Sequence, residues 1–140
     1  MTSRLNPYIQ FRDTAKEALE FYARVFGGEL TISTFGAMGV EGPEAEKIMH
    51  GMLTTPAGFR LMASDTPEQM EHTPGGNITI SLSGDDADEL RGWFAKLSDG
   101  ADVTLPLAAQ MWGDEFGMLT DRFGTSWMVN IATSQARQEA

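Results

Sequence analysis

One helical pattern occurs twice in this chain, and this repetition constrains the fold more than any other feature. Residues 19–25 read LEFYARV and residues 90–97 read LRGWFAKL, so an aliphatic residue, an aromatic pair, an alanine and a base follow in one order. Phe21 and Trp93 are the first aromatic residues of the two pairs, and about half of the chain separates them. In a chain of 140 residues, so long a period indicates one strand-and-helix module used twice.

The first copy is predicted to run strand, helix and three strands over residues 5–65. We expect a strand at 5–11, a helix at 15–26 and further strands at 29–35, 48–55 and 59–65. Thr14, with Glu17 three residues later, is typical of a capping box at a helix start. Gly27 and Gly28 are expected to end the helix, and segment 36–46, rich in Gly and Pro, is expected to be an exposed loop.

The second copy repeats this order over residues 76–132. We expect a strand at 77–83, a helix at 85–98 and strands at 103–107, 116–120 and 125–131, with a turn at 121–124. Segment 66–76 carries two Pro and two Gly, which is typical of a surface linker. Residues 133–140 lack large apolar side chains and are expected to fray. Residues 1–140 are therefore predicted to form a single domain of two modules and a short tail.

Alternation along the strands predicts which side chains share a face. Ile9 and Phe11 of the first copy match Ile80 and Leu82 of the second as the face packed on a helix. Tyr8, Gln10 and Thr79 then lie on the opposite face.

The last strands of the two copies follow the same rule. Leu61 and Trp127 are expected inside, which turns Met62 and Met128 to the other face, where parity also places His50 and Met52. The fold class predicted is α+β, with two βαβββ modules forming a curved eight-stranded mixed sheet around a cleft.

Charge and composition exclude several classes of partner. Twenty acidic and ten basic residues give a formal charge of −10, which repels nucleic acid and anionic membranes. No run of 18 apolar residues is present to span a bilayer, and residues 1–7 do not resemble a signal peptide. The chain has no Cys, which fits a reducing compartment. We expect a cytoplasmic protein whose ligands are neutral or cationic small molecules.

Several separated motifs resemble the vicinal oxygen chelate superfamily, which includes glyoxalase I, extradiol dioxygenases and the fosfomycin and bleomycin resistance proteins. The PhnB-like branch is the most similar. The motifs are Pro7–Phe11, Ala18–Tyr22, Phe26–Leu30, His50–Gly51, Leu61–Asp65, Trp112–Gly117, Asp121–Gly124 and Trp127. The resemblance covers residues 5–131 and implies paired βαβββ modules, a cleft between the sheets and a homodimer.

The resemblance also implies four metal-ligand positions, one on the first and one on the last strand of each module. They fall on Asn6, Met62, Asn77 and Met128. Divalent iron, nickel, zinc and manganese prefer carboxylates or imidazoles, whereas a Met thioether prefers soft Cu(I). We therefore predict no conventional divalent metal at these positions and no cofactor.

Two histidines are present, and only one is a candidate for chemistry. His72 lies in the linker and is expected to be solvated. His50 is expected to face the cleft, where its imidazole could exchange a proton near neutral pH as a catalytic group. The alternative is a structural histidine, hydrogen-bonded across the sheet or to a second subunit.

Adaptable apolar side chains are the strongest positive signal for a ligand site. Met52, Met62 and Met128 are predicted to line the cleft, and Trp112 is predicted to close over it with Met111, Phe116 and Met118. Tyr8, Gln10, Thr79 and His50 would orient a bound molecule. The same residues would also suit a filled cleft or a dimer seam.

The function predicted is binding of a small organic molecule, as a binder or a metal-free enzyme. Three alternatives stay open: a glyoxalase-type metal-dependent lyase, transferase or dioxygenase using residues such as His50 and Asp65; a drug-sequestering resistance protein; and a purely structural dimer. A methyltransferase activity is not expected, because no glycine-rich turn joins a strand to a helix.

Overall fold

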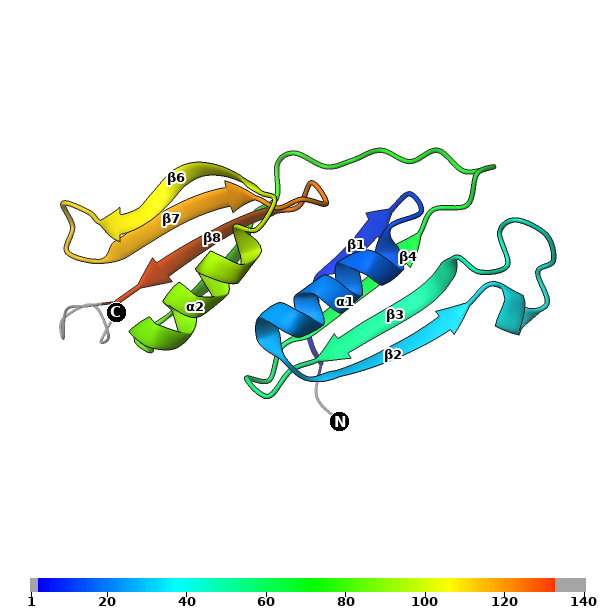
Figure 1. The fold of residues 1–140 in the computed structure, drawn as a ribbon, viewed down its shortest axis with the longest axis horizontal. Coiled ribbons are helices and arrows are strands. Elements are labelled where there is room, and N and C mark those ends of the chain that lie inside the picture. The colour runs from blue at the N-terminus through cyan, green and yellow to red at the C-terminus, as the bar shows by residue number, and fades with distance from the viewer. Residues whose placement is uncertain (1–2, 133–140) are drawn as a thin grey trace. The chain divides into compact units, whose positions relative to one another are not determined.

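The computed structural model describes residues 3–132 and divides the chain into two compact units (Figure 1). The units are Met1–Pro74 and Gly75–Ala140, which we call module 1 and module 2. Within residues 3–132 each unit holds four strands and one α-helix in the order β-α-β-β-β, which confirms the duplication. The expected tail at 133–140 lies outside the described residues.

Module 1 is a four-stranded mixed sheet with a helix on one face. Its elements are β1 (Tyr8–Phe11), α1 (Ala15–Phe26), β2 (Glu29–Thr34), the short 3-10 helix η1 (Gly36–Met38), β3 (Ile48–Thr54) and β4 (Arg60–Asp65). The strand order is β1-β4-β3-β2, with β1 and β4 parallel and the other pairs antiparallel. The first strand starts at Tyr8 rather than residue 5, because Pro7 has no N–H with which to extend the ladder.

Module 2 has the same topology. Its elements are β5 (Ile80–Gly84), α2 (Ala87–Leu97), β6 (Asp102–Ala109), β7 (Glu115–Thr120) and β8 (Ser126–Ile131), in the order β5-β8-β7-β6. The eight strands thus hydrogen-bond as two four-stranded sheets, one in each module. The α+β class and the two βαβββ modules are confirmed. β5 begins at Ile80 instead of residue 77. Its first paired residue, Ile80, lies opposite Trp127, and β8 itself begins only one residue earlier, at Ser126.

Strand pairing corrects the predicted alignment of the two first strands. Tyr8 pairs with Met62, whereas Ser81 pairs with Met128. Tyr8 is therefore equivalent to Ser81, and not to Thr79 as the sequence alignment predicts. Thr79 and Ser81 are separated by one full period of a strand, so the predicted faces are unchanged.

Each helix packs on one face of its own sheet, and a glycine makes room for it. A Cβ on Gly51 in β3 would lie 2.3 Å from Leu19 Cδ1 of α1. The equivalent Gly117 in β7 faces Phe94 of α2, whose Cε2 would lie 2.9 Å from an added Cβ. Helix side chains such as Leu19 and Tyr22 are completely buried in this layer.

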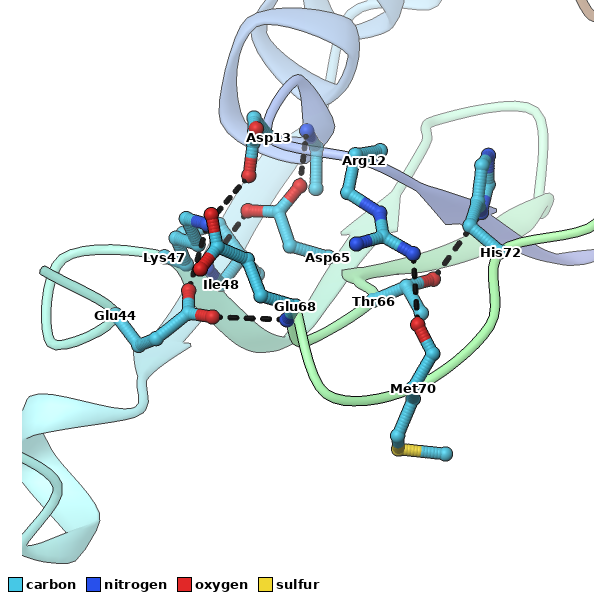
Figure 2. Close-up of polar contacts among 11 residues, drawn as sticks. Arg12, Asp13, Glu44, Lys47, Ile48, Asp65, Thr66, Glu68, Met70 and His72 are labelled. Carbon is cyan, nitrogen blue, oxygen red and sulfur yellow. Dashed lines mark hydrogen bonds and ion pairs between the residues drawn. The ribbon is translucent and has the colours of Figure 1, made fainter.

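The start of α1 differs from the capping box that the sequence predicts. The Thr14 side chain makes no capping hydrogen bond. Instead, the buried carboxylate of Asp65, at the end of β4, accepts hydrogen bonds from the backbone N–H of Ala15 and of Ile48, each at 2.9 Å (Figure 2). A single carboxylate therefore joins the ends of α1, β3 and β4.

A second buried carboxylate stabilises the last hairpin of module 2. Asp121 Oδ1 accepts hydrogen bonds from the backbone N–H of Phe123 and Thr125, at 2.9 and 3.0 Å. Its Oδ2 accepts the indole N–H of Trp127 at 2.8 Å. The predicted turn at 121–124 is confirmed, and its Asp and the following Trp have a structural explanation.

Candidate functional site

The helix-free face of module 1 is the face of its sheet opposite α1, and it carries most of the predicted site residues. Strand register places Tyr8, Met62, Met52 and Thr31 in one row, and on the same face Gln10 pairs with Ser64 and His50 pairs with Ser33. On this face Tyr8 is 47% exposed and Met52 and Met62 are half-buried, whereas Leu53 and Leu61 are buried on the helix side. The burial pattern agrees with the predicted parity of β3 and β4.

A β-bulge in β3 sets which of its side chains face α1 and which lie on the helix-free face. Ile48 pairs with Thr34 and His50 pairs with Ser33, so Met49 is an extra residue in β3. This bulge lets Ile48 be buried while His50 points away from the helix. β-bulges of this kind re-aim side chains and are frequent beside functional sites.

Tyr8 and His50 contact each other on this face. The phenol oxygen of Tyr8 lies 3.4 Å from His50 Nδ1, and the ring centroids are 5.7 Å apart. Either the phenol O–H donates to a neutral Nδ1, or an Nδ1–H donates to the phenol oxygen. The pair could orient a polar group of a ligand or move a proton to it.

A methionine pair lies at the equivalent place in each module. Met52 of β3 is directly opposite Met62 of β4, and Met118 of β7 is directly opposite Met128 of β8. In both pairs the two methionines are ten residues apart in the sequence. The sequence predicts the faces of Met52, Met62 and Met128 by parity but not the pairing, which the shared spacing of ten residues could have revealed.

In module 2, the predicted site residues do not all lie in the sheet. Met128 is half-buried beside Met118, as expected from parity. Thr79 precedes β5 and has no place in the strand register. Trp112, in the loop between β6 and β7, is 49% exposed, and its ring meets Phe116 edge-on with centroids 5.8 Å apart.

Next to this aromatic pair, sequence reasoning missed a buried acid. Asp114 is 1% exposed, and its Oδ2 accepts a hydrogen bond from Asn130 Nδ2 at 3.0 Å. The adjacent Glu115 forms an ion pair with Arg91 of α2, which lowers the pKa of the Glu115 carboxyl. A Trp followed by Gly-Asp-Glu at a hairpin is the only sequence signal for this arrangement.

The four positions that the family resemblance assigns to metal ligands hold amide and thioether side chains. Asn6 and Asn77 precede the strands of their modules, and Met62 and Met128 each face another methionine. Within residues 3–132 no three His, Asp or Glu side chains gather as a metal cluster. Asp65, named in the metal-dependent alternative, accepts one backbone N–H at each carboxylate oxygen and so has a structural role.

The predicted linker is partly attached to module 1. His72 is half-buried with its Nδ1 3.2 Å from Thr66 Oγ1, so the expectation of a solvated side chain is wrong. Arg12 Nη2 donates to the carbonyl of Met70 at 2.7 Å, and Glu44 accepts the backbone N–H of Glu68 at 2.8 Å (Figure 2). These contacts hold the segment from Thr66 to His72 against its own module.

Three charged side chains, Asp13, Glu44 and Lys47, form what we call the lysine clamp. Lys47 Nζ lies 2.7 Å from Asp13 Oδ1 and 2.6 Å from Glu44 Oε2 (Figure 2). The hydrogen bond from Lys47 lowers the pKa of Glu44, and the two carboxylates raise the pKa of Lys47. The clamp attaches the loop between η1 and β3 to the residues before α1.

Sequence comparison identifies a family model and several relatives. Residues 4–129 match the model of the Glyoxalase/Bleomycin resistance protein/Dioxygenase superfamily. Protein YjdN of Escherichia coli is 28% identical over 148 residues, covering 96% of this chain and 99% of that protein. The uncharacterized protein Mb0911c of Mycobacterium bovis is 33% identical over 132 residues, covering 88% of this chain and 79% of that protein.

Solved structures show the same fold. Protein PA1353 from Pseudomonas aeruginosa superimposes with a TM-score of 0.83 at 35% identity, over 93% of this chain and 98% of that chain. A PhnB protein from Bacillus cereus gives a TM-score of 0.72 at 23% identity, over 93% of this chain and 100% of that chain.

No helix of residues 3–132 is long and apolar enough to cross a membrane.

Proposed function

The chain belongs to the Glyoxalase/Bleomycin resistance protein/Dioxygenase superfamily, and from this premise we propose that it binds a small organic molecule on the helix-free face of module 1. The observation that carries the proposal is the contact between Tyr8 and His50 beside the Met52–Met62 pair. A polar pair next to adaptable apolar side chains is the usual composition of a small-molecule site.

Each element of this face has a separate part in binding. The thioether side chains of Met52 and Met62 repack around ligands of different shape at small cost. Tyr8 and Gln10 offer hydrogen-bonding groups from β1, and His50 can accept or donate a proton. Bound next to apolar side chains, a carbonyl or hydroxyl of the ligand would interact more strongly with these groups than it does in water.

Module 2, taken by itself, carries the remaining residues that we propose for ligand binding. Trp112 and Phe116 present the edge-on pair on which a flat molecule could stack, and Met128 presents a second adaptable thioether. Thr79 remains a proposed hydrogen-bonding residue. The net charge of −10 favours a neutral or cationic ligand over an anionic one.

The proposal includes no divalent metal, and it treats the protein as a cytoplasmic homodimer. The metal part rests on the amide and thioether donors at Asn6, Met62, Asn77 and Met128. We infer the cytoplasmic compartment from the lack of Cys in the sequence, and the homodimer from the family resemblance. Sequestration of the ligand and metal-free proton transfer by His50 are both compatible with this site.

Ligand-dependent thermal shifts test the proposal. The full chain is screened against neutral and cationic aromatic molecules, and each hit is repeated with His50→Gln, Tyr8→Phe and the control His72→Gln. A ligand at 100 times its Kd adds about 2.7 kcal/mol to stability. We expect the shift to shrink in the first two variants and to persist in the control.

Two results would overturn parts of this proposal. Shifts that are unchanged by both His50→Gln and Tyr8→Phe would move the site elsewhere. Stoichiometric nickel, zinc, manganese or iron in purified protein would contradict the metal-free part.

A further inference from the structure

The helix-free face of module 1 brings three neutral, comparatively soft donors together. Met52 and Met62 are directly opposite each other on adjacent antiparallel strands, where Cβ atoms are about 4.5–5.5 Å apart. His50 lies two residues before Met52 on the same face of β3. Because a methionine side chain has three rotatable bonds, both sulfur atoms can turn toward one point above the strand pair.

We propose that Met52, Met62 and His50 bind a soft monovalent cation, Cu(I) or Ag(I). Thioether sulfur is a ligand that selects Cu(I), and imidazole accompanies it readily, whereas hard divalent ions prefer oxygen. The three donors carry no formal charge when His50 is neutral, which suits an ion of charge +1. All three side chains are half-buried, so a bound ion would be partly shielded from water.

Tyr8 fixes the histidine for this role. Metal-bound histidines use one ring nitrogen for the ion and donate the other N–H to a neighbouring group. In His50 the neighbour is the phenol oxygen of Tyr8, 3.4 Å from Nδ1. Nε2 makes no hydrogen bond within the described chain, and it is the nitrogen that we assign to the cation.

Module 2 supplies a natural control within the same chain. Met118 and Met128 form the equivalent thioether pair, but Phe116 stands at the position that His50 holds in module 1. This pair therefore has two thioethers and no imidazole. The proposal predicts one tight site in the chain and not two.

This inference goes beyond the proposed function and does not depend on it. The cation alone is the probe, so a failed search for organic ligands would leave it standing. Conversely, absence of cation binding would leave the organic site untouched.

Titration of the metal-free full chain with Ag(I) in chloride-free, thiol-free buffer tests the site. Calorimetry gives the stoichiometry, and anaerobic competition with a chromogenic Cu(I) chelator gives the affinity. We expect one equivalent to bind tightly, and binding to be lost in Met52→Leu/Met62→Leu and in His50→Gln. Tyr8→Phe should weaken binding about 10-fold or more, the effect typical of an outer-shell partner.

Matched variants separate this site from adventitious binding. Met118→Leu/Met128→Leu and His72→Gln should leave the tight site unchanged, and Phe116→His should create a second equivalent in module 2. Methyl NMR signals of Met52 and Met62 should shift on titration while those of Met118 and Met128 stay in place. Tight binding that survives Met52→Leu/Met62→Leu, or affinity no greater than that of free methionine and histidine, overturns the proposal.

Discussion

Asp65 Oδ1 accepts the backbone N–H of Ala15 at 2.9 Å, so a residue at the end of β4 caps the helix that starts 50 residues earlier. Its other oxygen accepts the N–H of Ile48. Both donors belong to buried residues, so water does not readily replace the carboxylate as their acceptor. Module 1 therefore depends on this carboxylate for the ends of three elements.

Replacement of Asp65 should destabilise module 1 selectively. Asp65→Ala leaves two buried N–H groups without acceptors, at a cost of about 1–3 kcal/mol each. All three Trp residues lie in module 2 and both Tyr residues lie in module 1, so Trp fluorescence reports on module 2 alone. We expect the denaturation midpoint seen by Tyr signals to fall while the Trp midpoint stays in place.

The exposed cap of the second helix is the control for Asp65. The Asp86 side chain accepts the N–H of Glu89 at 3.1 Å at the start of α2. Asp86→Ala should cost about 0.5–2 kcal/mol and should shift the Trp transition instead. Equal shifts of both transitions in both variants would show that the modules unfold together.

Asp121→Ala should destabilise module 2 by breaking three hydrogen bonds at once. The variant removes the acceptor of the Trp127 indole and of two turn amides. Because Asp121 is 4% exposed, water does not readily replace it. We expect a loss of about 3 kcal/mol or more and a changed near-ultraviolet signal of Trp127, measured by circular dichroism. An unaltered Trp127 signal would contradict this account of the turn.

The lysine clamp should make the loop between η1 and β3 sensitive to acid. Lys47 lowers the pKa of Glu44, so the stabilisation is present above the ordinary Glu pKa and is lost as the pH falls through the lowered value. The raised pKa of Lys47 keeps that partner charged at neutral and mildly alkaline pH.

Hydrogen exchange of residues 36–47 measures the clamp. Protection should decrease below the ordinary Glu range in the wild type. In Lys47→Met protection should already be low at neutral pH and should change less on acidification. Arg60→Met, which alters a cation outside the clamp, should behave like the wild type.

Two glycine substitutions in module 2 should act in opposite directions. An added Cβ on Gly117 would lie 2.9 Å from the Leu107 Cα, a backbone atom that cannot move aside easily. Gly117→Ala should therefore cost about 1–3 kcal/mol through overpacking. Gly92, inside α2, has nothing within 4 Å of an added Cβ, so Gly92→Ala should stabilise by about 0.5–1 kcal/mol. Trp-detected denaturation measures both, and a destabilised Gly92→Ala would contradict the packing described for α2.

Local patterns in the sequence predict the elements well and their long-range contacts poorly. The helix at 15–26 and the last turn follow from spacing and turn residues alone. The capping role of Asp65 does not, because its partners lie 17 and 50 residues away. The predicted alignment of the first strands is wrong by one strand period, since an even shift preserves the apolar face and only pairing with β4 and β8 fixes the register.

The same limit applies to the candidate site. Parity alone places His50, Met52 and Met62 on one face, and the register agrees with it. The contact between Tyr8 and His50 requires β4 to lie between β1 and β3, which is a property of the topology. The bulge at Met49 leaves no sequence signature, because a single extra residue does not disturb the apolar pattern enough to be seen.

The parallel pairing of β1 with β4 also sets an order of events on the ribosome. Tyr8 pairs with Met62, and β4 is the only neighbour of β1 in the described sheet, although α1, β2 and β3 all come between them in the sequence. β1 can therefore complete its pairing only after residue 65 has been translated and has left the exit tunnel. Module 1 can close at that moment, while synthesis of module 2 is still under way, because all of its strands pair within the module.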